Sequence, residues 1–230
     1  MALKRLTLAD QVAQEIVQEI QALELRPDDE IPSEGVLARR FGVNRLVVRE
    51  AIRTLAAREI LVSSQGRPAR VRVPSARVFG QMLEFRLWQQ SLSFEDLLDT
   101  RRVIEGELAR RAALRVGANE ASTGAARSLL ARMADAVGDR DRFVDLDVAF
   151  HAAVARMAGG DMLRLVLSSL ERILVLARRA SYEGRVRRGQ DHSGTLRAHA
   201  TILDGIERGD PDAAAEAMAG HLAETEKDLR

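Results

Sequence analysis

The sequence predicts a mainly α protein, and three observations support this fold class. Apolar residues recur at three- and four-residue steps along most of the 230-residue chain, which is the period of amphipathic helices. Aromatic residues make up only 3% of the sequence, so the core must be aliphatic. Two short stretches that read as strands, 60–63 and 69–73, lie close together. We therefore expect two parts: residues 1–74 with a small sheet, and residues 75–230 as an antiparallel bundle of about seven helices.

The first part begins with two helices. Residues 8–25 form an amphipathic helix, and Thr7 is placed to cap it. Ser33 is a suitable cap for a second helix that runs to Phe41. Gly42 can end this helix, because glycine adopts a positive φ at little cost.

A third helix follows after a tight turn. Asn44 is placed to cap it, and its apolar stripe extends to about Ala57. The two short strands come next, joined by a turn at residues 64–68. Helix, turn, helix and two-stranded wing together make a winged helix-turn-helix. Arg45 and Arg49 lie at the start of the third helix, where a helix in the DNA major groove reads bases, and arginine pairs well with guanine.

Positive charge is concentrated in this region. Residues 35–73 contain nine arginines and two glutamates, a net charge of +7, whereas the whole chain carries +1. A solvated, arginine-rich helical hairpin would also show this pattern. The wing favours a nucleic-acid partner, so we expect the first part to bind double-stranded DNA.

Pro74 and Ser75 mark a linker, because proline cannot continue a central strand. Turn and capping signals after it predict helices at residues 77–89, 94–116, 119–137, 141–157, 161–182, 189–208 and 211 to near the C-terminus. The turns between these helices are short, as an antiparallel bundle requires.

Four polar residues fall on or beside the apolar faces of the bundle helices. Asp147 and His151 are one helical turn apart and share a face, and His199 and His221 lie in the middle of the last two helices. One carboxylate and three imidazoles can hold a divalent metal such as Zn²⁺, Ni²⁺ or Mn²⁺. Histidines on helices are also common as ordinary hydrogen-bonded residues. His192, two turns before His199, could replace it as a ligand, and the spacing leaves this open.

Two arginines are candidates for binding an anionic effector. Arg101 falls on the apolar stripe of the helix at 94–116, and Arg102 is next to it. A buried arginine needs a partner. Glu105, four residues on, is one candidate, and the carboxylate of a bound effector is the other.

Composition and motifs exclude several other classes of protein. The chain has no cysteine, so it has neither disulfides nor thiolate metal sites. We find no signal-peptide pattern and no apolar run near the roughly 20 residues of a membrane span, and expect a soluble, cytoplasmic protein without a membrane partner. His-Glu-x-x-His and related hydrolase motifs are absent, so we do not expect an enzyme. A metal-dependent hydrolase with a DNA-binding part is the less favoured alternative.

The motifs resemble those of a known family. PSEGVLARRFGVNRLVVREAIRTLAAREIL and SSQGRPARVRV resemble the DNA-binding domain of the GntR superfamily of transcription regulators. DLLDTRRVIE, DVAFHAAVA, HATILDGIERGD and MAGHL resemble the FCD effector domain of its FadR subfamily. The resemblance implies a homodimer on a palindromic operator, usually acting as a repressor. The residues expected to face DNA are Asn44, Arg45, Arg49, Gly66 and Arg67. Gly35 stands where the family usually has Arg or Lys, so one DNA contact is missing.

The resemblance also bears on the bundle. It implies that Asp147, His151, His199 and His221 bind the metal, which selects His199 over His192. It further implies a small organic acid as the effector, such as a hydroxy acid, sugar acid or dicarboxylate. A repressor that senses the metal itself is an alternative with the same ligands.

Overall fold

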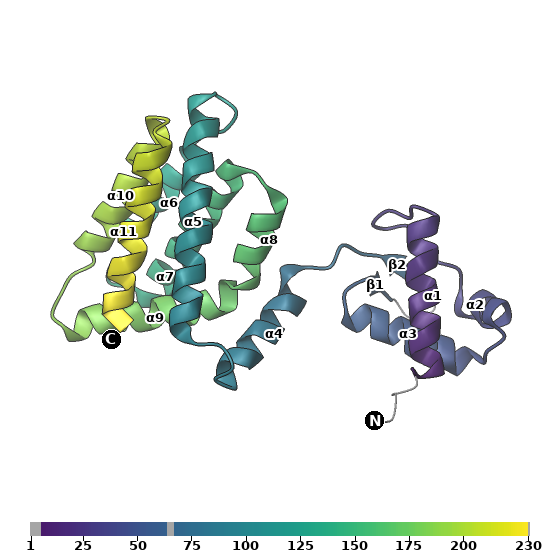
Figure 1. Ribbon diagram of the computed structural model, residues 1–230. Helices are drawn as coiled ribbons and strands as arrows, with labels where there is room; N and C mark the ends of the chain where they lie inside the picture. Colours follow the sequence, from purple (N-terminus) through teal and green to yellow (C-terminus); the bar gives the residue numbers. More distant parts are fainter. Residues whose placement is uncertain (1–5, 64–66, 230) are drawn as a thin grey trace. The chain divides into compact units, whose positions relative to one another are not determined.

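The computed structural model describes residues 6–63 and 67–229 (Figure 1). The chain divides into two compact units, Met1–Val78 and Phe79–Arg230, and each has its own hydrophobic core. The helices and strands confirm the predicted mainly α fold class.

In its described residues, the first unit contains three complete helices and a two-stranded antiparallel sheet. Its elements are α1 (Leu8–Ala22), α2 (Glu34–Phe41), α3 (Arg45–Ala57), β1 (Leu61–Val62) and β2 (Arg70–Val71). Leu61 pairs with Val71 in the sheet. The strands are shorter than predicted, and the first three residues of the predicted turn, Gly66 among them, lie outside the described residues. The winged helix-turn-helix expected from the sequence is therefore the fold of this unit.

The caps of these helices largely follow the sequence. Thr7 and Asp10 form a reciprocal capping box on α1, and Asn44 accepts a hydrogen bond from the Val47 backbone N–H at 2.9 Å. Gly42 ends α2 with φ of 64°. Ser33 occupies the N-cap position of α2, but its side chain makes no capping hydrogen bond, so that part of the prediction is wrong.

A buried glutamate ties the linker to the first unit. Glu59 is only 5% exposed and has a φ of 57°, which is unusual for a residue other than glycine. Its carboxylate accepts hydrogen bonds from the backbone N–H of Ser75 at 2.8 Å, from the Ser75 hydroxyl, and from Arg77 Nη2 at 2.7 Å. Ser75 and Arg77 together lower the pKa of Glu59 to about 2.

The second unit is a helical bundle. Within the described residues it has eight helices, of which α4 begins just before the division between the units: α4 (Ala76–Trp88), α5 (Phe94–Gly117), α6 (Gly124–Ala134), α7 (Arg140–Ala158), α8 (Asp161–Ser169), α9 (Glu171–Arg187), α10 (Ser193–Glu207) and α11 (Pro211–Leu229). The long helix α5 packs against α7, α10 and α11, and Figure 1 shows α5 in teal beside α11 in yellow. Their apolar faces form the core of the unit.

The helix predicted at 8–25 ends at Ala22 and the one predicted at 189–208 starts at Ser193, and two further differences are larger. The helix expected at 161–182 is two helices, α8 and α9, with a break at Leu170. The hydroxyls of Ser168 and Ser169 donate to backbone carbonyls three residues earlier, a local competition that weakens a helix at this point. Asn119, where the helix predicted at 119–137 begins, does not cap a helix. It has φ of 60° directly after α5, a conformation that asparagine tolerates, and α6 starts only at Gly124.

The apolar side chains of α4 are only partly buried. Leu83 and Leu87 pack on the bundle core, whereas Phe79 and Met82 are exposed. Trp88 is 77% exposed. Among the described residues, none of the helices combines the length and apolar character needed to span a bilayer.

Candidate functional site

Three helices of the bundle bring four predicted site residues together. Asp147 and His151 lie one turn apart on α7, His199 comes from the middle of α10, and His221 from the middle of α11. All four side chains are buried, and one potential ligand atom from each lies within 4.8 Å of the others. His192 does not belong to this group, so the four residues that meet are those expected from the resemblance.

Hydrogen bonds orient two of the imidazole rings. His199 Nδ1 lies 2.8 Å from the carbonyl oxygen of Thr195, which can only accept, so Nδ1 carries the proton. His151 Nδ1 is paired in the same way with the carboxylate of Glu105. The Nε2 atoms of both rings are left with lone pairs, lie 2.9 Å (His199) and 4.0 Å (His151) from Asp147 Oδ1, and find no hydrogen-bond partner among the described residues.

The charge states of these groups suit a cation. Burial acts to raise the pKa of Asp147, but Arg178 is the largest of the influences that outweigh it and hold that pKa well below its ordinary value. Burial lowers the pKa of His151, and burial together with His199 and His151 lowers that of His221 far below its ordinary value. Metal binding requires an ionised carboxylate and neutral imidazoles, and the pKa shifts of Asp147, His151 and His221 favour these states.

Arg101 and Glu105 form a buried ion pair next to the cluster. Arg101 is 1% exposed, and its Nε donates to Glu105 Oε1 at 2.7 Å. Burial acts to raise the pKa of Glu105, but Arg101 and His151 outweigh it, so that the pKa lies below its ordinary value. Arg101 Nη1 is also buried and has no partner in the part of the chain that the structure describes. Glu105 is thus a partner of Arg101, and one donor of the guanidinium remains for another acceptor.

Arg102, which was predicted to bind the effector, lies outside this site, whereas Arg178, which was not predicted, lies within it. Arg102 points away from the cluster and pairs with Asp99 and Glu226, so the structure does not bring it to this site. Arg178 of α9, which sequence reasoning missed, is buried and pairs with Asp147. Its position on the apolar stripe of α9, four residues after Leu174, is the signal that could have identified it.

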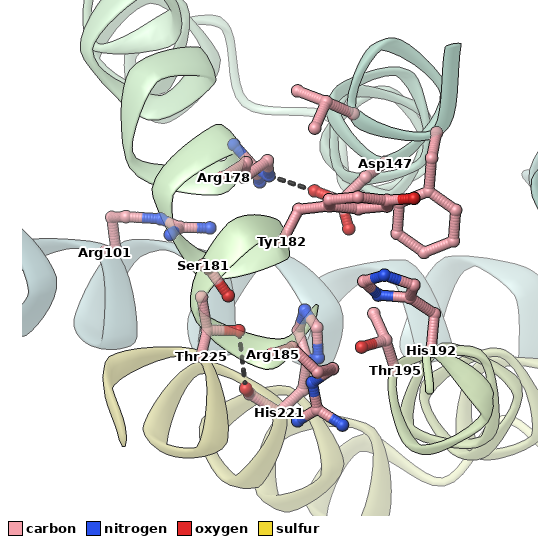
Figure 2. A pocket seen from close by; sticks show the side chains of 12 residues that line it. Arg101, Asp147, Arg178, Ser181, Tyr182, Arg185, His192, Thr195, His221 and Thr225 are labelled. Atoms are coloured by element: carbon pink, nitrogen blue, oxygen red, sulfur yellow. Dashed lines mark hydrogen bonds and ion pairs between the residues drawn. The ribbon is translucent and has the colours of Figure 1, made fainter. Parts of the chain in front are cut away.

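A cavity adjoins the cluster (Figure 2). Its lining includes Arg101, Asp147, Arg178 and His221. The lining also includes Ser181, Tyr182 and Arg185 of α9, His192 at the N-cap of α10 and Thr195 of α10, and Figure 2 shows the His192 ring beneath that of Tyr182. The cavity therefore reaches two of the four candidate ligands, Asp147 and His221, and a set of hydroxyl and imidazole groups.

The first unit carries a second candidate site, a concave surface between α2, α3 and the wing. Five arginines line it: Arg39, Arg45, Arg49, Arg53 and Arg67. Arg39 and Arg53 were not predicted, although Arg53 continues the four-residue series of Arg45 and Arg49 along α3. A surface of this curvature and charge matches a nucleic-acid backbone.

Two contacts hold arginine side chains of this surface in place. The guanidinium of Arg45 lies over Gly35, where a Cβ would come within 3.2 Å of Arg45 Nη2. Arg49 donates to Glu34 through Nε and Nη2, with Nη2 at 2.9 Å from Oε2. Asn44 is exposed, but its side-chain oxygen is used in capping α3.

Comparison with known families assigns both units. Residues 8–71 match the description "Bacterial regulatory proteins, gntR family", and residues 96–224, more than half of the chain, match the FCD domain. The chain belongs to the GntR family, with an FCD domain. It is accordingly a transcriptional regulator whose winged helix-turn-helix binds DNA.

Relatives of this GntR-family chain cover nearly all of it. It is 31% identical over 235 residues to the HTH-type transcriptional repressor NanR of Citrobacter rodentium, and 30% identical over 227 residues to NanR of an Enterobacter species. Each alignment covers 96% of this chain and 84% of the relative. The solved structure of Streptococcus agalactiae GntR has the same fold, with a TM-score of 0.65 at 24% identity, and the match covers 95% of this chain and 99% of that one.

The two candidate sites fall within the two matched regions. The arginine-lined surface lies inside the GntR region, and Asp147, His151, His199 and His221 lie inside the FCD region. The DNA-binding and effector-binding parts of the family are therefore represented by separate units of this chain.

Proposed function

We propose that this GntR-family regulator is a repressor controlled by a small organic acid, which binds beside a divalent metal in the FCD domain. The observation that carries the proposal is the buried cluster of Asp147, His151, His199 and His221 next to a cavity lined by Arg101. The chemistry of this donor set fits Zn²⁺, Ni²⁺ or Mn²⁺. When bound, the ion would supply positive charge and open coordination positions for an anionic ligand.

The protein's own residues would hold the acid. Arg101 Nη1 is a buried donor without a partner in the described chain, and a carboxylate oxygen would satisfy it. Arg178 adds positive charge at the same end of the cavity, although Asp147 offsets part of it. These two arginines favour an anion at the end of the cavity beside the cluster.

DNA recognition would rest on the concave surface of the first unit. Arg45 and Arg49 lie near the start of α3, where a recognition helix meets base edges, and Arg39, Arg53 and Arg67 are placed to reach phosphates. A homodimer would present two such surfaces to a palindromic operator. The relatives named as repressors support repression as the direction of control.

The DNA-binding assignment can be tested with duplexes selected from a random pool by the full-length protein. We expect Arg45→Ala to lose preference for the selected sequence while it retains metal binding. Arg58→Ala, at the end of α3 and outside the concave surface, is the matched control. Sequence-specific binding by Arg45→Ala would show that α3 is not the recognition helix.

The effector assignment can be tested with metal-loaded protein. Thermal-shift measurements over a panel of small carboxylates should reveal acids that stabilise the wild type but not His199→Ala. The same acids should change binding to the selected duplex. If chelation alone abolishes DNA binding and no acid has an effect, the protein senses metal and the acid-response proposal is wrong.

A further inference from the structure

A glutamate in a left-handed backbone conformation follows almost directly on α3. Glu59 has φ of 57°, and its backbone N–H donates to the carbonyl of Ala56 at 3.0 Å, which holds it against the last turn of α3. Glycine adopts this conformation at little cost, whereas a residue with a side chain is strained in it. The turn alone would therefore favour glycine, and the side chain of Glu59 contributes something that outweighs the strain.

This contribution is a set of contacts with the chain beyond the sheet. Glu59 is buried, and its Oε2 accepts from the backbone N–H and the hydroxyl of Ser75. Its Oε1 accepts from Nε and Nη2 of Arg77 at 3.1 and 2.7 Å. The carboxylate thus joins the end of α3 to the start of α4, and we refer to these four hydrogen bonds as the Glu59 clasp.

Little else holds the segment between β2 and α4. Residues 72–75 are exposed. Arg72 donates its backbone N–H to the carbonyl of Ile60 at 2.9 Å, and Pro74 has no N–H to donate. Within the described residues, the next hydrogen bonds along this segment are those of the clasp. The direction in which α4 leaves the first unit therefore depends on Glu59.

The same helix is held in the second unit from its second turn onward. Gly80 is buried, and a Cβ at this position would come within 2.3 Å of the carbonyl oxygen of Ser169, next to the break between α8 and α9. Leu83 packs on the core of the bundle. From α9, Arg178 pairs with Asp147 of the candidate metal cluster. A continuous series of contacts therefore leads from the cluster through α9 to α4, and along α4 to the clasp.

We infer that the Glu59 clasp is the joint that fixes the direction of α4 at the DNA-binding unit, and that it thereby sets the spacing at which two recognition helices meet DNA. The spacing part of this inference rests on the proposed function, because it takes the protein to be a dimer on a palindromic operator. The joint itself rests only on the contacts of Glu59.

The test replaces Glu59 by glycine. Glu59→Gly removes the carboxylate but suits the positive φ, so the first unit should remain folded. Glu24→Gly is the matched control, because Glu24 also has a positive φ, of 49°, after the end of a helix. Glu24 is exposed, and its carboxylate makes no hydrogen bond or ion pair in the part of the chain that the structure describes.

Pulsed electron paramagnetic resonance on the full-length protein measures the mobility of the joint. The chain has no cysteine, so nitroxide labels attach only to Glu50→Cys in α3 and Gln81→Cys in α4, both at exposed positions. Excess unlabelled protein removes distances between protomers. Glu59→Gly should make the distance distribution about twice as wide, and Glu24→Gly should leave it unchanged. An unchanged width in Glu59→Gly would overturn the inference.

DNA binding tests the consequence for spacing. The probes are the duplex selected by the wild type, the same duplex with one base pair inserted at its centre, and a single half-site. The insertion should cost the wild type and Glu24→Gly about tenfold in affinity, and Glu59→Gly about threefold or less, because a loose joint adapts to the changed spacing. Half-site affinity should be the same in all of them.

Two results of this experiment would overturn the inference. One is a tenfold effect of the insertion on Glu59→Gly, and the other is loss of half-site binding by this variant, which would limit Glu59 to the fold of the first unit. If the wild type itself tolerates the insertion, the proposed palindromic operator is wrong, and the distance distributions still decide whether the clasp fixes α4.

Discussion

At the scale of single residues, Glu105 is the side chain on which the geometry of the cluster depends most. One of its oxygens pairs with His151 Nδ1 and the other accepts from Arg101 Nε, so a single carboxylate orients a candidate ligand and neutralises a buried cation. Carboxylates that hold a metal-binding histidine in this way raise its basicity and fix its tautomer.

We expect Glu105→Gln to weaken metal binding by about 10- to 100-fold, since the amide cannot replace the charge that holds His151. The variant should also be less stable, because Arg101 would become an unpaired buried charge. Metal titration followed by elemental analysis measures the first effect. Glu107→Gln, on the exposed face of α5, is the control, and equal metal affinity in both variants would exclude this role for Glu105.

Glu59 makes the stability of the first unit depend on pH in the acidic range. Its pKa of about 2 lies below the ordinary 4.5, so its carboxylate stabilises the folded unit above pH 4.5, and this contribution is lost as the pH falls towards 2. Glu59→Gln should therefore be less stable than the wild type at neutral pH, with the difference vanishing near pH 2. Hydrogen exchange of peptides from residues 8–62 reports the stability of this unit. The control is Glu50→Gln, at an exposed position of α3. If the stability of both variants depended on pH in the same way, Glu59 would not be the source of the acid response.

At the scale of elements, close helix contacts depend on glycine. A Cβ at Gly205 of α10 would come within 2.9 Å of the backbone nitrogen of Ala214 in α11, and neither backbone can move freely in a packed core. Gly220 of α11 has no atom within 4 Å of the equivalent position and is exposed. These two glycines occupy helices of the same bundle but differ in what surrounds them.

Gly205→Ala should destabilise the protein by about 1–3 kcal/mol, because the added methyl group forces the two helices apart. Gly220→Ala should instead stabilise it by about 0.5–1 kcal/mol through its higher helix propensity. Chemical denaturation of both variants measures the difference. Opposite signs are the expected result, and a stabilised Gly205→Ala would show that the α10–α11 turn is not tightly packed.

The elements also show which features sequence patterns can reveal. Capping residues and periodicity identified α3 and α5 almost to the residue, because both signals are local. The break at Leu170 depends on serine hydroxyls that bond to the backbone, and the same residues could have continued a helix. Asn119 was assigned to the wrong helix because asparagine both caps N-termini and ends helices with a positive φ.

The candidate site shows the same limit. Asp147 and His151 share a face by their spacing alone, and the apolar surroundings of His199 and His221 suggest that these residues converge in the bundle. The choice of His199 over His192 comes only from the family resemblance. The apolar stripe of α9 marks Arg178 as a candidate for burial, but the sequence does not show that its partner is Asp147. That pairing depends on how α9 packs against α7, and this is a tertiary property.

At the scale of the whole molecule, metal occupancy should be linked to stability. A ligand that binds only the folded state at 100 times its dissociation constant adds about 2.7 kcal/mol to the free energy of unfolding. Chelation should therefore lower the thermal transition of the wild type and leave that of His199→Ala unchanged. Calorimetry with and without chelator measures this effect. A wild-type transition that does not respond to chelator or added metal would contradict the metal assignment.

The ion pair between Arg49 and Glu34 affects how the DNA affinity of the protein depends on salt concentration. Arginines that meet phosphates displace condensed counterions, and the logarithm of the binding constant falls with the logarithm of the salt concentration by about 0.9 per phosphate neutralised. Arg49 already has an internal counterion, which it must release before it can meet the duplex. Glu34→Gln should therefore bind random DNA more tightly and steepen this slope by about one unit, whereas Glu30→Gln, whose partner Arg70 lies outside the concave surface, should not. The Glu34 carboxylate would thus weaken binding to the many nonspecific sites of a genome. Arg49 would leave Glu34 only for duplexes whose contacts with it compensate for the lost ion pair.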